Sequence, residues 1–330
     1  MLLYSLLLFG IGIALLLKSS NLLVGNAAKL AKAFGTSEFV IGVGLIAIGT
    51  SLPELMVASI ASLTNNSGIA LGDIVGANIA NIALNLGISA SIASIYIKRR
   101  IFDKDCLIVF GSAALLYVLS LDNVISRIDG IILLGIFIYY ALFLFGRIKH
   151  LEEVFEFRSY INLFFNRGNG REKIAKEKIE MKNFLLVALS IAALLFGGYL
   201  LVSGASGIAD GLNLSGGLVG LTLVALSTSA PELAVSLQAI KRRMPNILIG
   251  NILGSNIANV LLVIGFAALL NPLNVANSML NYSMPLMLII SAVLLMFGYV
   301  SLRISRREGL LLIALYIAAI YFSFAGAITA

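Results

Sequence analysis

The sequence predicts an all-α, polytopic membrane protein in which ten transmembrane helices form two inverted five-helix repeats. Three observations support this fold class: an apolar composition, a biased placement of basic residues, and an internal repeat. Of the 330 residues, 60% are hydrophobic and only 12% are charged, and the mean hydropathy is +1.02. A soluble chain of this length would expose too much apolar surface. Runs of about 20 apolar residues instead suit helices that cross a hydrocarbon core about 30 Å thick.

The apolar segments recur along the whole chain, and polar residues fall between them. No basic residue precedes the first segment, so we interpret it as an uncleaved span rather than a signal peptide. We expect helices to cross the bilayer at residues 2–24, 37–63, 69–95, 105–121, 129–146, 183–209, 215–240, 246–270, 281–302 and 309–327.

The basic residues predict the orientation of these spans. With the N-terminus outside, 22 of the 23 Lys and Arg residues lie on the inner side and only Arg127 lies outside. The opposite orientation would violate the positive-inside rule. We therefore expect an integral plasma-membrane protein with both termini outside. The net charge of +7 follows from this bias and does not indicate a nucleic-acid partner.

One polar segment, residues 147–182, separates the two halves, and its 36 residues are too few for an additional domain of ordinary size. We interpret it as a solvated cytoplasmic linker; a regulatory or lipid-facing helix is the alternative. The predicted organisation is thus a first five-helix repeat at 1–146, the linker at 147–182, and a second, inverted five-helix repeat at 183–330.

A constant offset of 178 residues relates the two halves. It aligns Glu54 with Glu232 and continues without a gap to Asn81 and Asn259. Five predicted spans separate equivalent positions. Because five is odd, the second copy crosses the membrane in the opposite direction. Inverted repeats of this kind form alternating-access transporters whose binding site lies at the midplane between the repeats.

Each repeat carries one glutamate in the pattern Thr-Ser-X-Pro-Glu. Glu54 is the only charged residue between positions 39 and 72, and Glu232 is the only one between 211 and 240. A carboxylate in the bilayer centre costs at least ~2.5 kcal/mol on insertion scales, so each glutamate indicates a functional site. The two together suggest one shared cation site.

The neighbouring residues would supply this site with oxygen atoms alone. Pro53 and Pro231 lack an N–H and free backbone carbonyls one turn earlier. The single Cys106 and the single His150 exclude a cysteine cluster and make a histidine site implausible. Oxygen ligands favour hard cations such as Ca²⁺ and Na⁺. The hydroxyls at hand belong to Thr50, Ser51, Thr228 and Ser229.

A second element follows in each repeat, with two glycines four residues apart and an asparagine five residues after the second glycine. The glycines, at 72 and 76 and at 250 and 254, permit close helix packing. Asn81 and Asn259 lie deeper and need a partner, which is either an ion or another helix. Asn78 and Asn256 are the better candidates for bonds between helices.

The two elements together closely resemble the α-repeats of sodium/calcium exchangers, which belong to the cation/calcium antiporter superfamily, and the resemblance covers the whole chain. It implies a secondary active antiporter that exchanges Ca²⁺ for Na⁺ by alternating access, not an enzyme. It implies Ca²⁺ and Na⁺ as transported ligands and no cofactor, and we expect a monomeric functional unit in the bilayer.

The same resemblance implies a role for each site residue. Glu54 and Glu232 would bind Ca²⁺ together with the carbonyls of Thr50 and Thr228. Flanking Na⁺ sites would use the Ala47 carbonyl, Ser51 and Ser255 on one side, and the Ala225 carbonyl and Ser229 on the other. Asn81 and Asn259 would face the middle.

The chain departs from the family pattern at three positions. Ser227 replaces a glycine. Ala77 replaces a serine, which removes one hydroxyl from the Na⁺ site nearer the outside. Asn259 stands where some members carry aspartate, which leaves two carboxylates in the core. Asp73, whose repeat mate is Asn251, has two interpretations: it attracts cations at the entrance, or it is stabilised by a helix N-terminus.

The same sequence features suggest three alternative functions. A proton-coupled antiporter would use the same glutamates, with protonation in place of Na⁺. A cation channel fits an inverted repeat with two charged ligands less well. An intramembrane aspartyl protease is disfavoured, because the sequence at 70–73 lacks the first glycine of that motif and no second intramembrane aspartate pairs with Asp73.

Overall fold

The computed structural model describes residues 2–34, 36–144, 181–211 and 229–329. The described chain is almost entirely helical, with four two-residue strands in the connections. By length and composition, six of its helices could cross a membrane, or seven if the bent pair Glu38–Thr50 and Leu52–Leu63 counts as one span. The prediction of an all-α membrane protein is confirmed. Every predicted span overlaps a described helix, although most of the seventh lies outside the described residues.

The described part of the first half contains nine helical segments and three wider π-helical turns. They are α1 (Leu2–Phe34), α2 (Glu38–Ile41), η1 (Gly42–Ala47), α3 (Ile48–Thr50), α4 (Leu52–Leu63), α5 (Ser67–Ile79), η2 (Ala80–Leu86), α6 (Gly87–Ile92), α7 (Arg99–Ile101), η3 (Phe102–Cys106), α8 (Leu107–Leu119) and α9 (Arg127–Leu144). The first helix continues to Phe34, beyond its expected end at 24, because its last turns bury residues such as Leu30 against the rest of the protein.

The described second half has the same kinds of element. They are α12 (Met181–Gly211), α14 (Ala230–Lys241), α15 (Pro245–Ala258), η4 (Asn259–Ile264), α16 (Gly265–Leu270), η5 (Met279–Ser283), α17 (Met284–Ser301) and α18 (Arg306–Thr329). The strands are β1 (Ile95–Tyr96), β2 (Val124–Ile125), β3 (Leu273–Asn274) and β4 (Arg303–Ile304).

The 178-residue offset of the sequence recurs in the backbone. Adding 178 to the first and last residue numbers of α4 gives those of α14, and the same holds for α6 and α16. The turns after α4 and α14 have residues with positive φ at equivalent positions, Asn65 (60°) and Arg243 (58°). Their closing hydrogen bonds match as well: Asn66 N donates to Ala61 O at 2.7 Å, and Met244 N donates to Ala239 O at 2.8 Å.

The strand pairs show how the halves are related. β1 pairs antiparallel with β4, and β2 pairs antiparallel with β3. The offset carries β1 onto β3, and an offset of 179 carries β2 onto β4. Each half therefore supplies one strand to each pair, and exchanging the halves exchanges the pairs. This is the pairing expected of a two-fold relation.

Two helices occupy the centre of the molecule. In the apolar windows of Ser67–Ile92 and Pro245–Leu270, 78% and 83% of the residues are buried, compared with 17% in Arg127–Leu144. The outer helices expose large apolar side chains such as Tyr299 and Val300, as a lipid-facing surface requires. The motif asparagines thus lie on the two most enclosed helices.

Glycines bring α15 against α2 and η1, as the sequence predicted for this repeat. A methyl group on Gly250 would lie 2.6 Å from Phe39 O, and one on Gly254 would lie 2.7 Å from Val43 Cα. For the mates Gly72 and Gly76, no described atom approaches closer than 3.9 Å. The segment equivalent to η1 in the second half falls within 212–228, outside the described residues.

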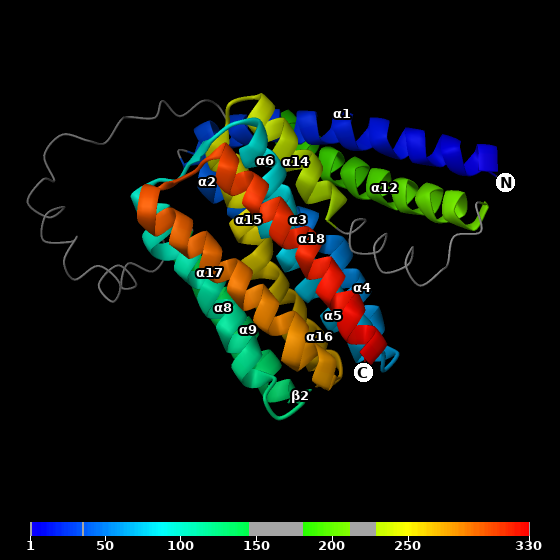
Figure 1. Ribbon diagram of the computed structural model, residues 1–330. Helices are drawn as coiled ribbons and strands as arrows, with labels where there is room; N and C mark the ends of the chain where they lie inside the picture. Colours follow the sequence, from blue (N-terminus) through cyan, green and yellow to red (C-terminus); the bar gives the residue numbers. More distant parts are fainter. Residues whose placement is uncertain (1, 35, 145–180, 212–228, 330) are drawn as a thin grey trace, which may run out of the picture.

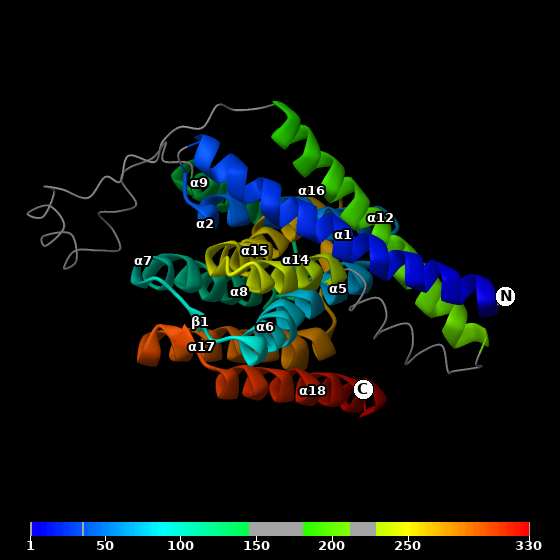
Figure 2. The same ribbon diagram turned by 90° about the horizontal axis from the view of Figure 1, so that it is seen from above.

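The long helices α1 and α12 form a separate layer. They lie side by side and extend past the other helices towards the N-terminus of α1 (Figures 1 and 2). A methyl group on Gly12 would lie 2.5 Å from Leu201 N, and one on Gly204 would meet Phe9 N. Small residues therefore let the two backbones approach closely.

Candidate cation site

Glu54 lies where the second predicted span bends. The helices Glu38–Thr50 and Leu52–Leu63 meet at an angle of 44°, with Pro53 in the first turn of α4. Glu54 belongs to the same turn and is 0% exposed. Among the described residues, neither of its carboxylate oxygens has a hydrogen-bond partner. The proline break thus directs an acidic side chain into the interior.

Glu232 occupies the equivalent place in the second half. It lies in the first turn of α14, next to Pro231, and is 0% exposed. Within the described part of the chain, its carboxylate has no hydrogen bond of good geometry, although the hydroxyls of Thr50 and Ser255 lie close to it. Thr50 Oγ1 and Ser255 Oγ are 3.5 Å apart.

The fold brings the two glutamates together from opposite halves. Glu54 is close enough to Glu232 for their charges to interact, and Asp73 lies within the same range of both. In the described ranges, no three Asp, Glu, His or Cys side chains converge closely enough to hold a metal ion by themselves. A cation bound here would therefore depend on neutral oxygens as well as on carboxylates.

The hydroxyl residues of the two motifs are also buried. Ser51 and Ser229 are 2% and 3% exposed, and within the described chain neither hydroxyl has a hydrogen-bond partner. Ala47 is different, because its carbonyl accepts hydrogen bonds from Ser51 N at 2.9 Å and from Thr50 Oγ1 at 3.1 Å. That carbonyl is occupied in the described conformation. The predicted ligands Ala225 and Thr228, and the substituted position Ser227, lie outside the described residues.

The asparagines connect the two central helices. Asn78 Nδ2 donates to Asn256 O at 3.3 Å, and Asn259 Nδ2 donates to Asn78 Oδ1 at 3.1 Å. Asn81 Oδ1 accepts from Asn85 Nδ2 at 2.9 Å within its own helix. The structure therefore gives Asn78 the interhelical role expected of it. Asn256 accepts with its backbone carbonyl and donates its amide to Ile252 O in its own helix at 2.8 Å.

Asn259 uses only one end of its side-chain amide in a bond to another helix. Its amide nitrogen binds Asn78, while its Oδ1 is buried and, among the described residues, has no partner. The remaining predicted positions, Ala77 and Ser255, are both 0% exposed and lie on α5 and α15. Ala77 offers no side-chain oxygen, so the two repeats are not chemically equivalent at this position.

Two polar residues near the site were not among the predicted ligands. Asp73 is 6% exposed and lies in the second turn of α5, so a helix N-terminus does not account for it. Its mate Asn251 accepts from Thr50 Oγ1 and donates to Glu232 O, both at 3.4 Å. The signal was present in the sequence: both residues follow the first glycine of the second motif.

These features define a class: a helical membrane protein in which buried oxygen atoms from two related halves gather at the centre, as in ion transporters. The comparison with known families identifies the group within that class. The family model for sodium/calcium exchanger proteins matches residues 4–146 and 182–325. The chain belongs to the sodium/calcium exchanger family.

Individual relatives cover nearly the whole chain. The sodium/calcium exchanger MaX1 of Methanosarcina acetivorans is 33% identical, over 93% of this chain and 95% of its own length. The inner membrane protein YrbG of Escherichia coli is 28% identical, over 79% of this chain and 78% of its own. Among solved structures, the sodium-calcium exchanger NCX_Mj soaked with Na⁺ and Sr²⁺ superposes with a TM-score of 0.81 and 33% identity, covering 97% of this chain and 99% of that one.

Proposed function

We propose that the chain is a secondary active antiporter that exchanges Ca²⁺ for Na⁺ by alternating access. One observation carries the proposal: Glu54 and Glu232 come from different halves, are 0% exposed, lie within range of each other's charge and, in the described chain, lack hydrogen-bond partners. Each ionised carboxylate in such a place costs several kcal/mol unless it is paired. A cation bound between them would offset this cost.

The composition of the site favours Ca²⁺ and Na⁺ over softer metals. Ca²⁺ takes six to eight oxygen ligands at about 2.3–2.6 Å. We assign Ca²⁺ to Glu54 and Glu232 with the carbonyls of Thr50 and Thr228. We assign Na⁺ to the remaining oxygens, with Ser51 and Ser255 on one side and Ser229 on the other. The Ala47 carbonyl would join after Thr50 Oγ1 releases it, the Ala225 carbonyl would complete the other side, and the Oδ1 atoms of Asn81 and Asn259 would face the centre.

Charge compensation would couple the two ions. An empty site with two adjacent carboxylates is costly to carry through a low-dielectric interior, whereas an occupied one is neutralised. The transition between outward and inward states would therefore require bound Ca²⁺ or bound Na⁺. Asp73 adds a third acidic group nearby, which would favour occupancy by more than one monovalent ion.

We infer that the repeats span 1–146 and 183–330 and are inverted, with 147–182 as a cytoplasmic linker. Matching turns and exchanged strand pairs support the two-fold relation, and the basic residues support plasma-membrane insertion with both termini outside. One chain supplies both glutamates, so we propose a monomeric unit. The glycine-mediated contact of α1 with α12 would let this layer slide over the core as one body.

Flux measurements test the proposal. Purified full-length protein in vesicles should take up ⁴⁵Ca²⁺ when Na⁺ is loaded inside, and uptake should stop when K⁺ replaces Na⁺. A proton antiporter would instead follow an imposed pH gradient without Na⁺, and a channel would pass Ca²⁺ without a counter-ion. Uptake that is independent of the Na⁺ gradient would overturn the proposal. Family membership does not favour the proton-coupled alternative.

A further inference from the structure

A second group of buried polar atoms lies on helices that pack against each other. Asn85 belongs to η2, Ser89 to α6 and Ser236 to α14, and α14 contacts both η2 and α6. All three residues are 0% exposed. In the described part of the chain, Asn85 Oδ1, Ser89 Oγ and Ser236 Oγ have no hydrogen-bond partner. Because a buried polar atom without a partner destabilises the folded state, the group points to a ligand.

The two serines differ from other buried serines of this protein. Ser20, Ser120 and Ser291 are 0–2% exposed, and each hydroxyl donates to the carbonyl four residues earlier at 2.6–2.8 Å. A helix thus satisfies a serine hydroxyl that points back along its own axis. Among the described residues, the hydroxyls of Ser89 and Ser236 make no such bond. They are therefore available to a ligand.

The internal repeat shows that packing does not require polar atoms at these positions. The 178-residue offset gives each member of the group an apolar mate that is also 0% exposed: Val263 for Asn85, Ala267 for Ser89 and Ala58 for Ser236. Apolar side chains thus fill the equivalent places in the other half. The polar group is confined to one of two related regions, which points to a role on one side of the protein.

Asn85 and Ser89 face away from the helix that packs on α6. Asn85 Nδ2 donates to Asn81 Oδ1 at 2.9 Å, so these amides share one face, and Ser89 follows Asn85 by one further turn. The opposite face holds Gly87, where a methyl group would lie 3.0 Å from Gly309 O of α18. The polar face therefore runs from Asn81, a proposed ion ligand, towards the end of α6.

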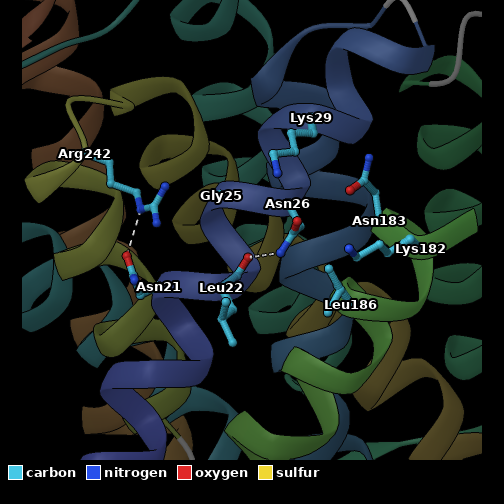
Figure 3. A pocket seen from close by; sticks show the side chains of 9 residues that line it. All are labelled: Asn21, Leu22, Gly25, Asn26, Lys29, Lys182, Asn183, Leu186 and Arg242. Carbon is cyan, nitrogen blue, oxygen red and sulfur yellow. Dashed lines mark hydrogen bonds between the residues drawn. The ribbon is translucent and has the colours of Figure 1, made fainter. Parts of the chain in front are cut away.

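On α14 the group lies between Glu232 and the basic end of the helix. Ser236 follows Glu232 by one turn, on the same face and about 6 Å along the axis. The residue after α14 is Arg242, which borders a cavity with Lys29 and Lys182 (Figure 3). These basic residues mark the side predicted to be cytoplasmic. Ser236 thus lies between the glutamate site and that side.

The chemistry of the group favours Na⁺ over Ca²⁺. The three side chains offer two hydroxyls and one amide oxygen, and no carboxylate. Ca²⁺ takes six to eight oxygens, commonly from carboxylates, and removing an ion from water costs more as its charge rises. A singly charged ion that keeps part of its water shell meets both conditions. Neutral oxygens also hold it weakly enough for it to leave, as ion passage requires.

We propose that Asn85, Ser89 and Ser236 form a transit site for Na⁺ between the central cation site and the cytoplasm. A partly hydrated Na⁺ satisfies the three oxygens on its way to or from Glu54 and Glu232. Because the mates of the three residues are apolar, the two sides of the protein differ in their affinity for Na⁺. The direction of passage rests on the proposed exchange function, whereas the binding of Na⁺ does not.

Replacing the two serines with the residues of their mates tests the binding without transport. Ser89→Ala and Ser236→Ala are combined in the full-length protein, because alanine occupies both equivalent positions. Thermal unfolding of the purified protein is followed as NaCl replaces choline chloride. The slope of stability against the logarithm of Na⁺ concentration counts the ions bound to the folded state. The double variant should bind about one Na⁺ fewer than the wild type, while its response to Ca²⁺ stays unchanged.

A matched control separates this site from the general loss of a hydroxyl. Ser291→Ala removes a buried hydroxyl that donates to Met287 O at 2.8 Å, and it should leave the Na⁺ slope at the wild-type value. Asn85 is kept in the double variant because it also bonds the proposed ligand Asn81. If the double variant does not yield monodisperse protein, Ser236→Ala alone should lower the slope in the same direction.

Flux measured from each side tests the direction of passage. In inside-out membrane vesicles, the double variant should need about tenfold more cytoplasmic Na⁺ for half-maximal Ca²⁺ exchange, the effect of losing one interaction with a charged group. Its Na⁺ dependence in right-side-out vesicles should stay unchanged. An equal effect at both faces would overturn the proposal.

The binding assay also distinguishes an ion from a structural water. An unchanged Na⁺ slope with higher ion-free stability would mean that the group holds water only, and the transit site would be rejected. A wild type that does not exchange ions, with a Na⁺ slope that still falls in the double variant, would contradict the exchange function and leave the Na⁺ site standing.

Discussion

Replacing Glu232 with Gln tests whether this side chain binds Ca²⁺ or only stabilises the fold. Gln has nearly the same shape, so packing at this fully buried position is preserved while the charge is removed. Ca²⁺ and the folded state should then respond in opposite directions. Binding should weaken, because the ion loses a charged ligand. The ion-free protein should be at least as stable, because one buried carboxylate near Glu54 has been neutralised.

The magnitude follows from the burial of the carboxylate. Removing one partner of a buried charge arrangement costs about 3–5 kcal/mol. At about 1.4 kcal/mol for each factor of ten, Ca²⁺ affinity should fall by a factor between roughly 140 and roughly 3,700. The gain in ion-free stability can reach several kcal/mol where both carboxylates are ionised, since that is the desolvation cost of one ion. A purely structural Glu232 would instead lose stability on substitution.

Two assays on the same purified samples decide the matter. Isothermal titration with Ca²⁺ gives the affinity, and thermal unfolding with and without Ca²⁺ gives the stability. Glu38→Gln is the matched control, because Glu38 begins α2 away from the site and should change neither quantity. A Glu232→Gln protein that binds Ca²⁺ as the wild type does, or that unfolds earlier without ions, would refute the assignment.

Three further predictions concern two residues near the glutamates and one in the α1–α12 layer. Asp73→Asn should weaken Ca²⁺ binding by about tenfold, less than the glutamate variants, because its charge acts at longer range; unchanged affinity in titration would contradict this. Ala77→Ser should strengthen external Na⁺ binding by restoring a hydroxyl, and an unaltered Na⁺ dependence of Ca²⁺ flux would exclude position 77 as a ligand. Gly204→Val should slow exchange while equilibrium Ca²⁺ binding stays intact, because its side chain would meet the backbone at Phe9; a wild-type exchange rate would argue against a sliding layer.

The sequence predicted the elements that depend on local pattern. Apolar runs identified the helices, and the 178-residue offset implied equivalent backbone paths in the two halves. The structure shows such equivalence at Asn65 and Arg243, which share a left-handed backbone. Position within the motif also predicted the burial of Glu54 and Glu232. These features follow from spacing alone, because two segments with the same spacing of residues adopt the same backbone conformation.

Contacts between the halves were harder to predict, because they depend on how two helices rotate against each other. The bond from Asn259 to Asn78 follows from packing between the halves that no spacing reveals. The Ala47 carbonyl is occupied locally, by Ser51 N and Thr50 Oγ1 of its own segment. The sequence left two interpretations of Asp73 open for the same reason, and the structure adds that Asp73 lies within range of both glutamates. Repeat symmetry identified its mate Asn251 as an equivalent position without showing that it would contact Thr50.

The strongest argument for transport lies in the oxygen atoms that the fold leaves without partners. A buried polar atom without a hydrogen bond costs about 1–3 kcal/mol, and a charged one costs more. Within the described chain, such atoms gather at matched positions of both motifs, in Ser51 and Ser229 as well as in Glu54 and Glu232. A protein that needed only stability would replace them with apolar side chains. Their retention in both halves is explained if an ion satisfies them for part of each cycle and leaves them for the rest.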